Sequence, residues 1–199
     1  MSTRAFLSCG SYSSPSSRQR PSRRVPSGRP PEPAKLCPAA SSSSNRREAP
    51  SARRATPSLG AALVDVNNGS YTGVITIDVC GDTTEGTSAV LNASGTGGSS
   101  YTGVTIAPAG GVPRTISGGI AAILIDLNGA GGVVIDGLNS GGNALTIENT
   151  STAASAATIR FIGDASGNTV RNSTIKGATT GTSSGTIVFA TGTTTGNTE

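Results

Sequence analysis

The sequence contains no histidine and no tryptophan, and aromatic residues make up only 3% of it. Without histidine the chain cannot form a Ser-His-Asp triad, a Cys-His pair or a histidine-ligated metal centre. The lack of tryptophan removes the usual core anchor of an immunoglobulin-like sandwich, and no repeated aromatic motif of a propeller blade is present. Long apolar runs are also missing, because polar residues or glycine interrupt each of them, so no transmembrane segment is predicted.

Positive charge is confined to the first part of the chain. Residues 1–57 hold 11 of the 15 Lys and Arg residues and have a net charge of +9, whereas residues 58–199 have a net charge of −5. The first segment is also rich in Ser and Pro, a composition that buries too little apolar surface to offset chain entropy. We therefore predict a disordered basic tail over 1–57 and a folded domain over 58–199. The arginine pairs of the tail raise the hypothesis of a nucleic-acid binder, but the lack of interleaved aromatic residues favours a solvated tail without a nucleic-acid partner.

The three cysteines, Cys9, Cys37 and Cys80, are odd in number and irregularly spaced, and they fit no metal-binding pattern. Cys80 ends an apolar run and is expected to be a small core residue. Cys9 and Cys37 could form a disulfide, although two free thiols are the simpler expectation. No metal ion and no cofactor is predicted.

A short amphipathic helix is predicted at the start of the folded domain. Thr56 and Pro57 resemble an N-cap and a first helical position. The apolar residues that follow fall on one helical face: Leu59, Ala62, Leu63 and Val66. The run 67–69, Asn-Asn-Gly, supplies a stop signal.

Beyond this helix the apolar pattern changes to a period of two. Short β-branched runs alternate with stretches of Gly, Ser, Thr and Asn, and no helical pattern separates them, which excludes alternating strands and helices. The predicted strands are 74–79, 89–91, 104–106, 123–127, 133–138, 145–147, 158–162, 169–175 and 186–189.

The spacing of similar strands favours a solenoid. The pattern of 133–137 recurs at 158–163 and again at 186–189, and that of 145–149 recurs at 169–173. A repeat of roughly 25 residues would give about five to six coils. Stacked Val, Ile and Leu suit a narrow core, and Gly-Asn pairs such as Gly167-Asn168 suit its corners. We therefore predict an all-β fold, a parallel β-helix with an N-terminal capping helix.

From Leu59 onward the sequence resembles secreted bacterial right-handed parallel β-helix proteins, also described as β-strand-repeat proteins, with a pectin-lyase-like fold. The resemblance implies export, a place at the cell surface or outside the cell, and further coils after residue 199, so that the chain would be a fragment. The segment 1–57 matches nothing in this family and stands where a signal peptide is expected. About 140 residues carry the resemblance, in structural motifs at 59–85 (LGAALVDVNNGSYTGVITIDVCGDTTE), 89–108 (AVLNASGTGGSSYTGVTIAP), 114–151 and 158–177.

Enzymes of the β-helix class need carboxylates that lie close together, in glycoside hydrolases as an acid and its partner and in lyases around calcium beside a cation. In this chain we expect the acidic residues and their neighbouring arginines to lie in turns and on the surface. We also expect a surface ion pair between Asp136 and Arg160, which are 24 positions apart. No calcium-binding motif is recognised, and no catalytic, cofactor or metal residue is assigned. The candidates are Asp126, Asp136, Glu148 and Asp164, with Arg160 and Arg171.

The function expected from this pattern is a non-enzymatic extracellular or cell-surface structural module of adhesin type. Its expected partners are polysaccharide or other cell-surface components, and further coils of a longer protein. The alternative is a fragment of a carbohydrate-active enzyme, either a polysaccharide lyase or a glycoside hydrolase. Carboxylates gathered on one flank would favour the enzyme, and scattered carboxylates would favour the scaffold.

Overall fold

The computed structural model describes residues 35–36, 56–138, 144–182 and 184–191. One α-helix, one short 3-10 turn and thirteen strands lie in these ranges. They are β1 (Lys35–Leu36), α1 (Leu59–Asn67), β2 (Thr72–Val79), β3 (Thr83–Glu85), β4 (Ala89–Asn92), β5 (Ser100–Pro108), the 3-10 turn Ala109–Gly111, β6 (Arg114–Gly118), β7 (Ile123–Asn128), β8 (Val133–Asp136), β9 (Leu145–Asn149), β10 (Ala157–Ile162), β11 (Thr169–Arg171), β12 (Ser173–Gly177) and β13 (Ile187–Phe189).

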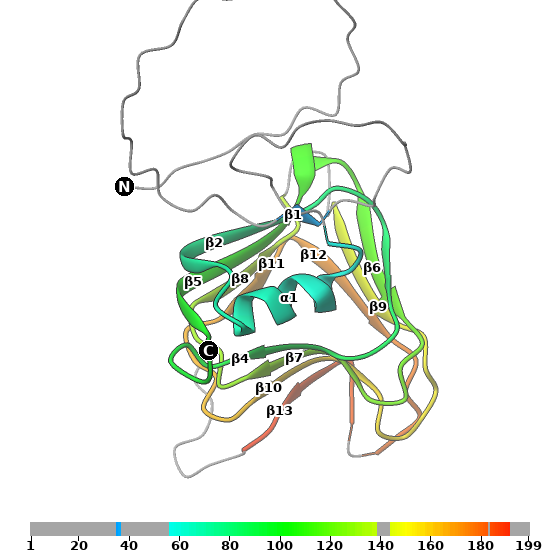
Figure 1. Cartoon of the computed structure of the whole chain (residues 1–199). Coiled ribbons are helices and arrows are strands. Elements are labelled where there is room, and N and C mark those ends of the chain that lie inside the picture. The colour runs from blue at the N-terminus through cyan, green and yellow to red at the C-terminus, as the bar shows by residue number, and fades with distance from the viewer. Residues whose placement is uncertain (1–34, 37–55, 139–143, 183, 192–199) are drawn as a thin grey trace, which may run out of the picture.

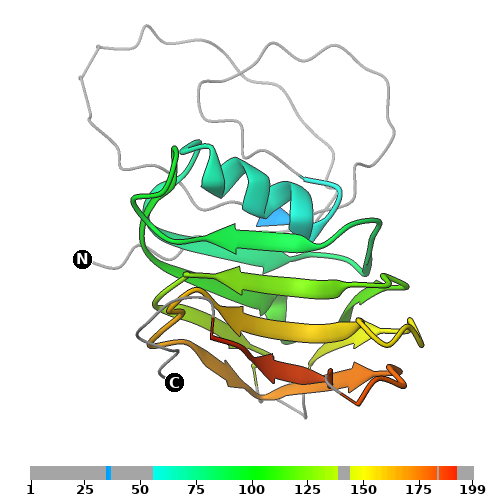
Figure 2. The same cartoon turned by 90° about the horizontal axis from the view of Figure 1, so that it is seen from below.

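The strands form three sheets that enclose a triangular cross-section (Figure 1). The sheet orders are β1-β2-β5-β8-β11, β12-β9-β6-β3 and β13-β10-β7-β4. Strand pairs within each sheet are parallel, and the chain visits the three sheets in turn. The described residues therefore build a parallel β-solenoid of four coils, which Figure 2 shows stacked from the side. This confirms the predicted all-β solenoid.

The predicted repeat length is wrong. Ile106 lies 29 residues after Ile77, its partner on the preceding coil, and Leu127 lies 36 residues after its partner Leu91. The longer coils reduce the expected five or six to four in the described residues. Strands of different sheets share the same alternation of apolar and polar residues. In the sequence, β8 therefore resembles β10 and β9 resembles β11, although the two strands of each pair belong to different sheets.

The core consists of apolar columns along the solenoid axis. Ile77, Ile106 and Ile135 are consecutive partners in one sheet, and all three are completely buried. Ile116 and Ile147 stack in the same way in the second sheet. Because neighbouring strands lie about 4.8 Å apart, each aliphatic side chain packs on its equivalent one coil away. The predicted stacking of inward residues is therefore confirmed.

The helix α1 lies across one end of the solenoid and closes its core (Figures 1 and 2). Its predicted inner face is confirmed, since Leu59, Ala62, Leu63 and Val66 have no exposed surface. The predicted N-cap is wrong, because the helix begins at Leu59 and the Ser58 hydroxyl accepts from the Ala61 N–H at 3.2 Å. The helix ends at Asn67, Asn68 is its C-cap, and Gly69 follows with φ +75°, as the stop signal predicted.

Two polar side chains fasten α1 to the first coil. The buried carboxylate of Glu85 on β3 accepts from the backbone N–H groups of Leu59 and Gly60, each at 2.8 Å. At the other end of the helix, the Asn67 amide donates to the Val90 carbonyl at 2.9 Å and accepts from the Asn92 N–H at 3.0 Å. Asn67 thus bonds to the free edge of β4 as a neighbouring strand would. The negative charge of Glu85 also suits the positive end of the helix dipole.

One strand of the fold lies within the predicted tail. Lys35 and Leu36 form β1, which pairs in parallel with the outer edge of β2. The other residues of 1–55 lie outside the described part of the chain. Within the described ranges, no helix has both the length and the apolar character needed to span a membrane.

Candidate functional site

The candidate acidic and basic residues lie on different sides of the solenoid. Asp126 and Arg160 belong to the sheet of β4, β7, β10 and β13, whereas Asp136 and Arg171 end strands of the sheet that contains β2. Glu148 lies on β9 in the third sheet. Among the described residues, no three His, Cys, Asp or Glu side chains gather closely enough to hold a metal ion. The carboxylates are therefore scattered.

Asp126 and Arg160 form a bidentate ion pair between two coils. They are register partners on β7 and β10. The Arg160 Nε donates to Asp126 Oδ1 at 3.0 Å, and its Nη2 to Oδ2 at 2.7 Å. Donation of these hydrogen bonds to the Asp126 carboxylate raises the pKa of the Arg160 guanidinium. The predicted pair of Arg160 with Asp136 is wrong, because the coil between β7 and β10 spans 34 residues rather than about 25.

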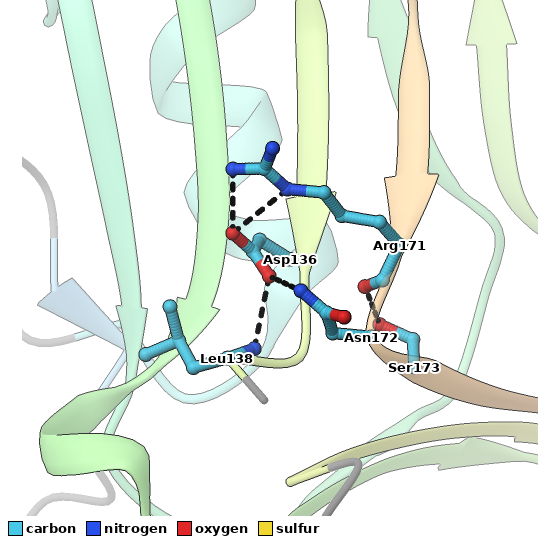
Figure 3. A network of polar contacts seen from close by, with 5 residues as sticks. All are labelled: Asp136, Leu138, Arg171, Asn172 and Ser173. Atoms are coloured by element: carbon cyan, nitrogen blue, oxygen red, sulfur yellow. Dashed lines mark hydrogen bonds and ion pairs between the residues drawn. The ribbon is translucent and has the colours of Figure 1, made fainter. Parts of the chain in front are cut away.

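Asp136 is the centre of a second network, which Figure 3 shows. Its Oδ1 accepts from the Asn172 side chain at 3.0 Å and from the Leu138 N–H at 2.9 Å. Its Oδ2 accepts from Arg171 Nε at 3.0 Å and pairs with Nη2 at 2.9 Å. The Ser173 hydroxyl donates to the Arg171 carbonyl at 2.9 Å. One carboxylate thus caps its own corner, as predicted, and also binds the next coil.

The Asp136 network makes stability depend on pH. Burial alone raises the pKa of the Asp136 carboxyl, but hydrogen bonds from Asn172, Leu138 and Arg171 outweigh burial, and the pKa lies below its ordinary value. A group with a lowered folded-state pKa stabilises the fold above its unfolded pKa of about 3.9, and this contribution disappears as pH falls through the folded value. The affected window therefore lies at and below about pH 4.

We expect Asp136→Asn to lower the free energy of unfolding at pH 7 by about 1 kcal/mol, a value that allows for the 59% exposure of the Arg171 side chain. Urea unfolding of both proteins from about pH 7 to pH 2 should show this gap narrowing below about pH 4, as the wild-type carboxyl takes up its proton. A gap of constant size across that range would contradict the role assigned to the Asp136 charge.

The remaining candidates have separate surroundings. Glu148 is half-buried and lies opposite Lys176 across β9 and β12. Asp164 follows β10 in a loop, with a left-handed φ of +63°. The outer face of the same sheet as Glu148 carries three threonines in register, Thr115, Thr146 and Thr174. This sheet therefore presents hydroxyl groups beside one acidic and one basic side chain.

The structure also contains a buried asparagine that sequence reasoning did not single out. Asn149 is 1% exposed. Its Nδ2 donates to the carbonyl oxygens of Ile120 at 3.0 Å, Ala122 at 3.0 Å and Ala157 at 2.9 Å. Its Oδ1 accepts from the N–H groups of Ile120 at 3.1 Å and Ser151 at 3.2 Å. Asn149 therefore joins the corners of two consecutive coils.

Asn168 makes a similar connection at another corner. Its Oδ1 accepts from the Val133 N–H and its Nδ2 donates to the Ala130 carbonyl, both at 2.9 Å. The sequence predicted a corner at Gly167-Asn168, and Asn168 lies at a corner, between β10 and β11. The bond to the preceding coil, however, depends on coil register, which the local sequence does not contain.

Cys80 is bonded in a disulfide. It is half-buried and directly follows β2, so the expectation of a small buried core thiol is wrong. The other two cysteines of the chain, Cys9 and Cys37, lie outside the described residues.

A shallow, mainly apolar groove lies at the end of the solenoid opposite α1. The rings of Phe161 and Phe189 stack there, with centroids 4.9 Å apart and planes inclined by 8°. Phe189 is 60% exposed and Ile187 is 42% exposed. In the described part of the chain, β11, β12 and β13 each have a strand neighbour on one side only. The groove is lined by Phe161, Asn168, Val170, Ile187 and Phe189.

No family model, no curated protein and no solved structure matches this chain. Its likeness to β-helix proteins thus consists of the sequence pattern and the coil architecture.

Proposed function

We propose that the chain is a non-enzymatic structural module of an extracellular or cell-surface β-helix protein of adhesin type, right-handed and pectin-lyase-like in its coil. The observation that carries the proposal is the use made of its acidic side chains. Asp126 and Asp136, the candidates flanked by cations, each bind a guanidinium of the next coil. They lie on two different sheets. Hydrolysis or elimination on a polysaccharide needs acidic and basic groups that converge on one bond.

The disulfide of Cys80 supports a place outside the cytoplasm. Disulfides persist in oxidising compartments and on cell surfaces, whereas cytosolic thiols are kept reduced. A secreted solenoid with a narrow core also gains from a covalent bond, because its coils contact only their neighbours.

The expected ligand is polysaccharide or another polar cell-surface component. Outward hydroxyl groups recur at the coil spacing along Thr115, Thr146 and Thr174, and Thr84 and Ser117 form a second such pair. Hydroxyl rows can hydrogen-bond to sugars. Because aromatic residues are scarce in the sequence, stacking on sugar rings contributes little, and we expect weak, multivalent binding.

The end formed by β11, β12 and β13 is the proposed attachment point for further coils. Each of these strands offers an unpaired edge in the described residues, next to the apolar groove around Phe161 and Phe189. A solenoid buries such an end by stacking another coil or a cap on it. The α1 end differs, since a helix and the strand β1 already cover it.

The proposal is tested by incubating the full chain with a panel of neutral and acidic polysaccharides. Reducing ends, unsaturated products and polymer length are then measured, and retention on insoluble polysaccharide is measured in parallel. We expect unchanged polymer length together with salt-tolerant, low-affinity retention. Cleavage that persists in wild-type protein and disappears in a folded Asp126→Asn or Glu148→Gln variant would overturn the proposal in favour of the carbohydrate-active alternative.

Location is tested separately on cells that naturally make the protein. Trypsin added to intact cells should remove it from the cell-associated fraction, or it should be found in the medium. Recovery of the intact protein from the cytosol of trypsin-treated cells would contradict the extracellular assignment.

A further inference from the structure

The disulfide of Cys80 involves a cysteine that the described residues do not include. Cys80 is the first residue after β2, the strand of the first coil with which β1 pairs. The rest of the sequence offers two cysteines, Cys9 and Cys37. The two choices have different structural consequences, because Cys37 directly follows β1 whereas Cys9 is 26 residues before Lys35.

The register of β1 on β2 distinguishes the two choices. Lys35 is the partner of Asp78, and Leu36 is the partner of Val79, in a parallel pair. Cys37 is the next residue in the sequence after Leu36, and Cys80 is the next after Val79, so each cysteine is one residue beyond the last register pair. Neighbouring strands lie about 4.8 Å apart, which is within the Cα separation of about 4.4–6.8 Å that a disulfide requires.

We infer that Cys37 is the partner of Cys80, and that this disulfide holds β1 along the edge of β2 and thereby closes the N-terminal end of the solenoid. Formation of the bond joins the two sulfur atoms and releases two protons and two electrons. A disulfide-containing oxidant, such as an oxidised dithiol protein, accepts the electrons and becomes a dithiol. Cys9 then stays outside the pair.

The disulfide would hold the short strand β1 in place against β2. A strand of two residues makes too few backbone hydrogen bonds to hold its place alone. Without β1, the eight-residue strand β2 would present a free edge, and such edges pair with other chains. The covalent loop from 37 to 80 also contains α1, so the capping helix and the edge-covering strand belong to one closed loop. The folded unit consequently begins before Thr56, within the segment that composition alone assigns to the tail.

Peptide mapping of the full chain, purified from oxidising conditions, tests the pairing. Free thiols are blocked, the denatured protein is cleaved with trypsin without reductant, and linked peptides are identified by mass. Cleavage after Lys and Arg places each cysteine in a different peptide, 5–18, 36–46 and 55–114. We expect 36–46 linked to 55–114, with Cys9 blocked as a free thiol. A link from 5–18 to 55–114 would overturn the pairing while leaving a disulfide in support of extracellular location. Recovery of Cys80 as a blocked free thiol would overturn the pairing and would also remove the support that the disulfide gives to an extracellular location.

Two variants test whether the disulfide stabilises the fold and keeps the edge of β2 covered. Cys9→Ser should melt at the wild-type temperature and remain monomeric. Cys9→Ser combined with Cys37→Ser should melt roughly 5–10 °C lower and should self-associate through the exposed edge of β2. Reductant should shift the wild type by a similar amount and leave the double variant unchanged, a comparison that remains available if the double variant folds poorly. Equal melting temperatures for the two variants, with no response of the wild type to reductant, would overturn the inference.

Discussion

A Gly137→Ala variant is expected to lose about 3 kcal/mol or more of its free energy of unfolding. Gly137 lies at the corner after β8, where the corner of the next coil comes closest. A methyl group at this position would overlap the backbone carbonyl oxygen of Asn172 and would lie 3.0 Å from the Ser173 hydroxyl. The Gly137 N–H also donates to the Arg171 carbonyl at 3.0 Å. Neither backbone can move away without breaking this hydrogen bond and the Asp136 network.

Gly86→Ala is the matched control. A methyl group at Gly86 meets no atom within 4 Å, and the residue has no left-handed backbone conformation. Its free energy of unfolding should stay within about 0.5 kcal/mol of the wild type in urea denaturation. If Gly137→Ala and Gly86→Ala lost equal free energies of unfolding, the close approach of Gly137 to the Asn172 backbone would be contradicted.

The second large effect is expected for Asn149→Ala, with a loss of about 3–4 kcal/mol. The substitution removes the amide nitrogen that donates hydrogen bonds to the carbonyl oxygens of Ile120, Ala122 and Ala157. It also removes the acceptor for the N–H groups of Ile120 and Ser151. Of these five hydrogen bonds, the one to the Ala157 carbonyl is buried and the other four are partly buried. A buried backbone group left without a partner costs about 1–3 kcal/mol and a partly buried one costs less, and a water in the vacated space would make about three hydrogen bonds rather than all five.

Asn128→Ala provides the comparison for Asn149. Asn128 also lies at a corner, but it is exposed, and its side-chain contact with Asn92 is a long one of 3.4 Å. We expect Asn128→Ala to change the free energy of unfolding by less than about 0.5 kcal/mol. If both alanine variants unfolded at the same urea concentration, Asn149 would have no special role in joining coils.

The local elements of this fold could be predicted from the sequence because their signals are local. The apolar face of α1 follows from the spacing of Leu59, Ala62, Leu63 and Val66, and all four are buried. Alternation of β-branched residues similarly predicted most of the strands, but it missed β3 and β6, and its single run 169–175 is two strands, β11 and β12, of different sheets. The predicted N-cap was displaced by two residues, since Thr56 and Ser58 are both capable N-caps. The helix begins at Leu59, whose N–H donates to Glu85, a contact between residues 26 positions apart that the local sequence does not contain.

Coil assignment could not be predicted, because it depends on loop lengths rather than on strand patterns. Strands of all three sheets have the same inward alternation, so β8 and β10 look like repeats of each other although they belong to different sheets. An error of about nine residues in the coil length then changes every contact between coils. It moves Arg160 from its true partner Asp126 to Asp136, and it hides the bonds of Asn149 and Asn168.

The candidate site was predicted correctly in one respect, the turn-capping role of Asp136. Its carboxylate accepts from the Leu138 N–H two residues later, a contact that needs only local geometry. Its bonds to Arg171 and Asn172 join residues 35 and 36 positions apart and follow from coil register. The acidic residues of this chain therefore connect coils, and their arrangement supports a structural role.

Coil register is the basis of every contact between coils described above, and paired cysteine variants measure it directly. Thr115 and Thr146 are register partners on β6 and β9, and Thr146 and Thr174 are partners on β9 and β12. Partners lie about 4.8 Å apart, whereas Thr115 and Thr174 lie about 10 Å apart, beyond the reach of a disulfide. Under mild oxidation, Thr115→Cys with Thr146→Cys should form a disulfide in a folded chain, and Thr115→Cys with Thr174→Cys should not. A disulfide in the second variant, or none in the first, would contradict the four-coil solenoid.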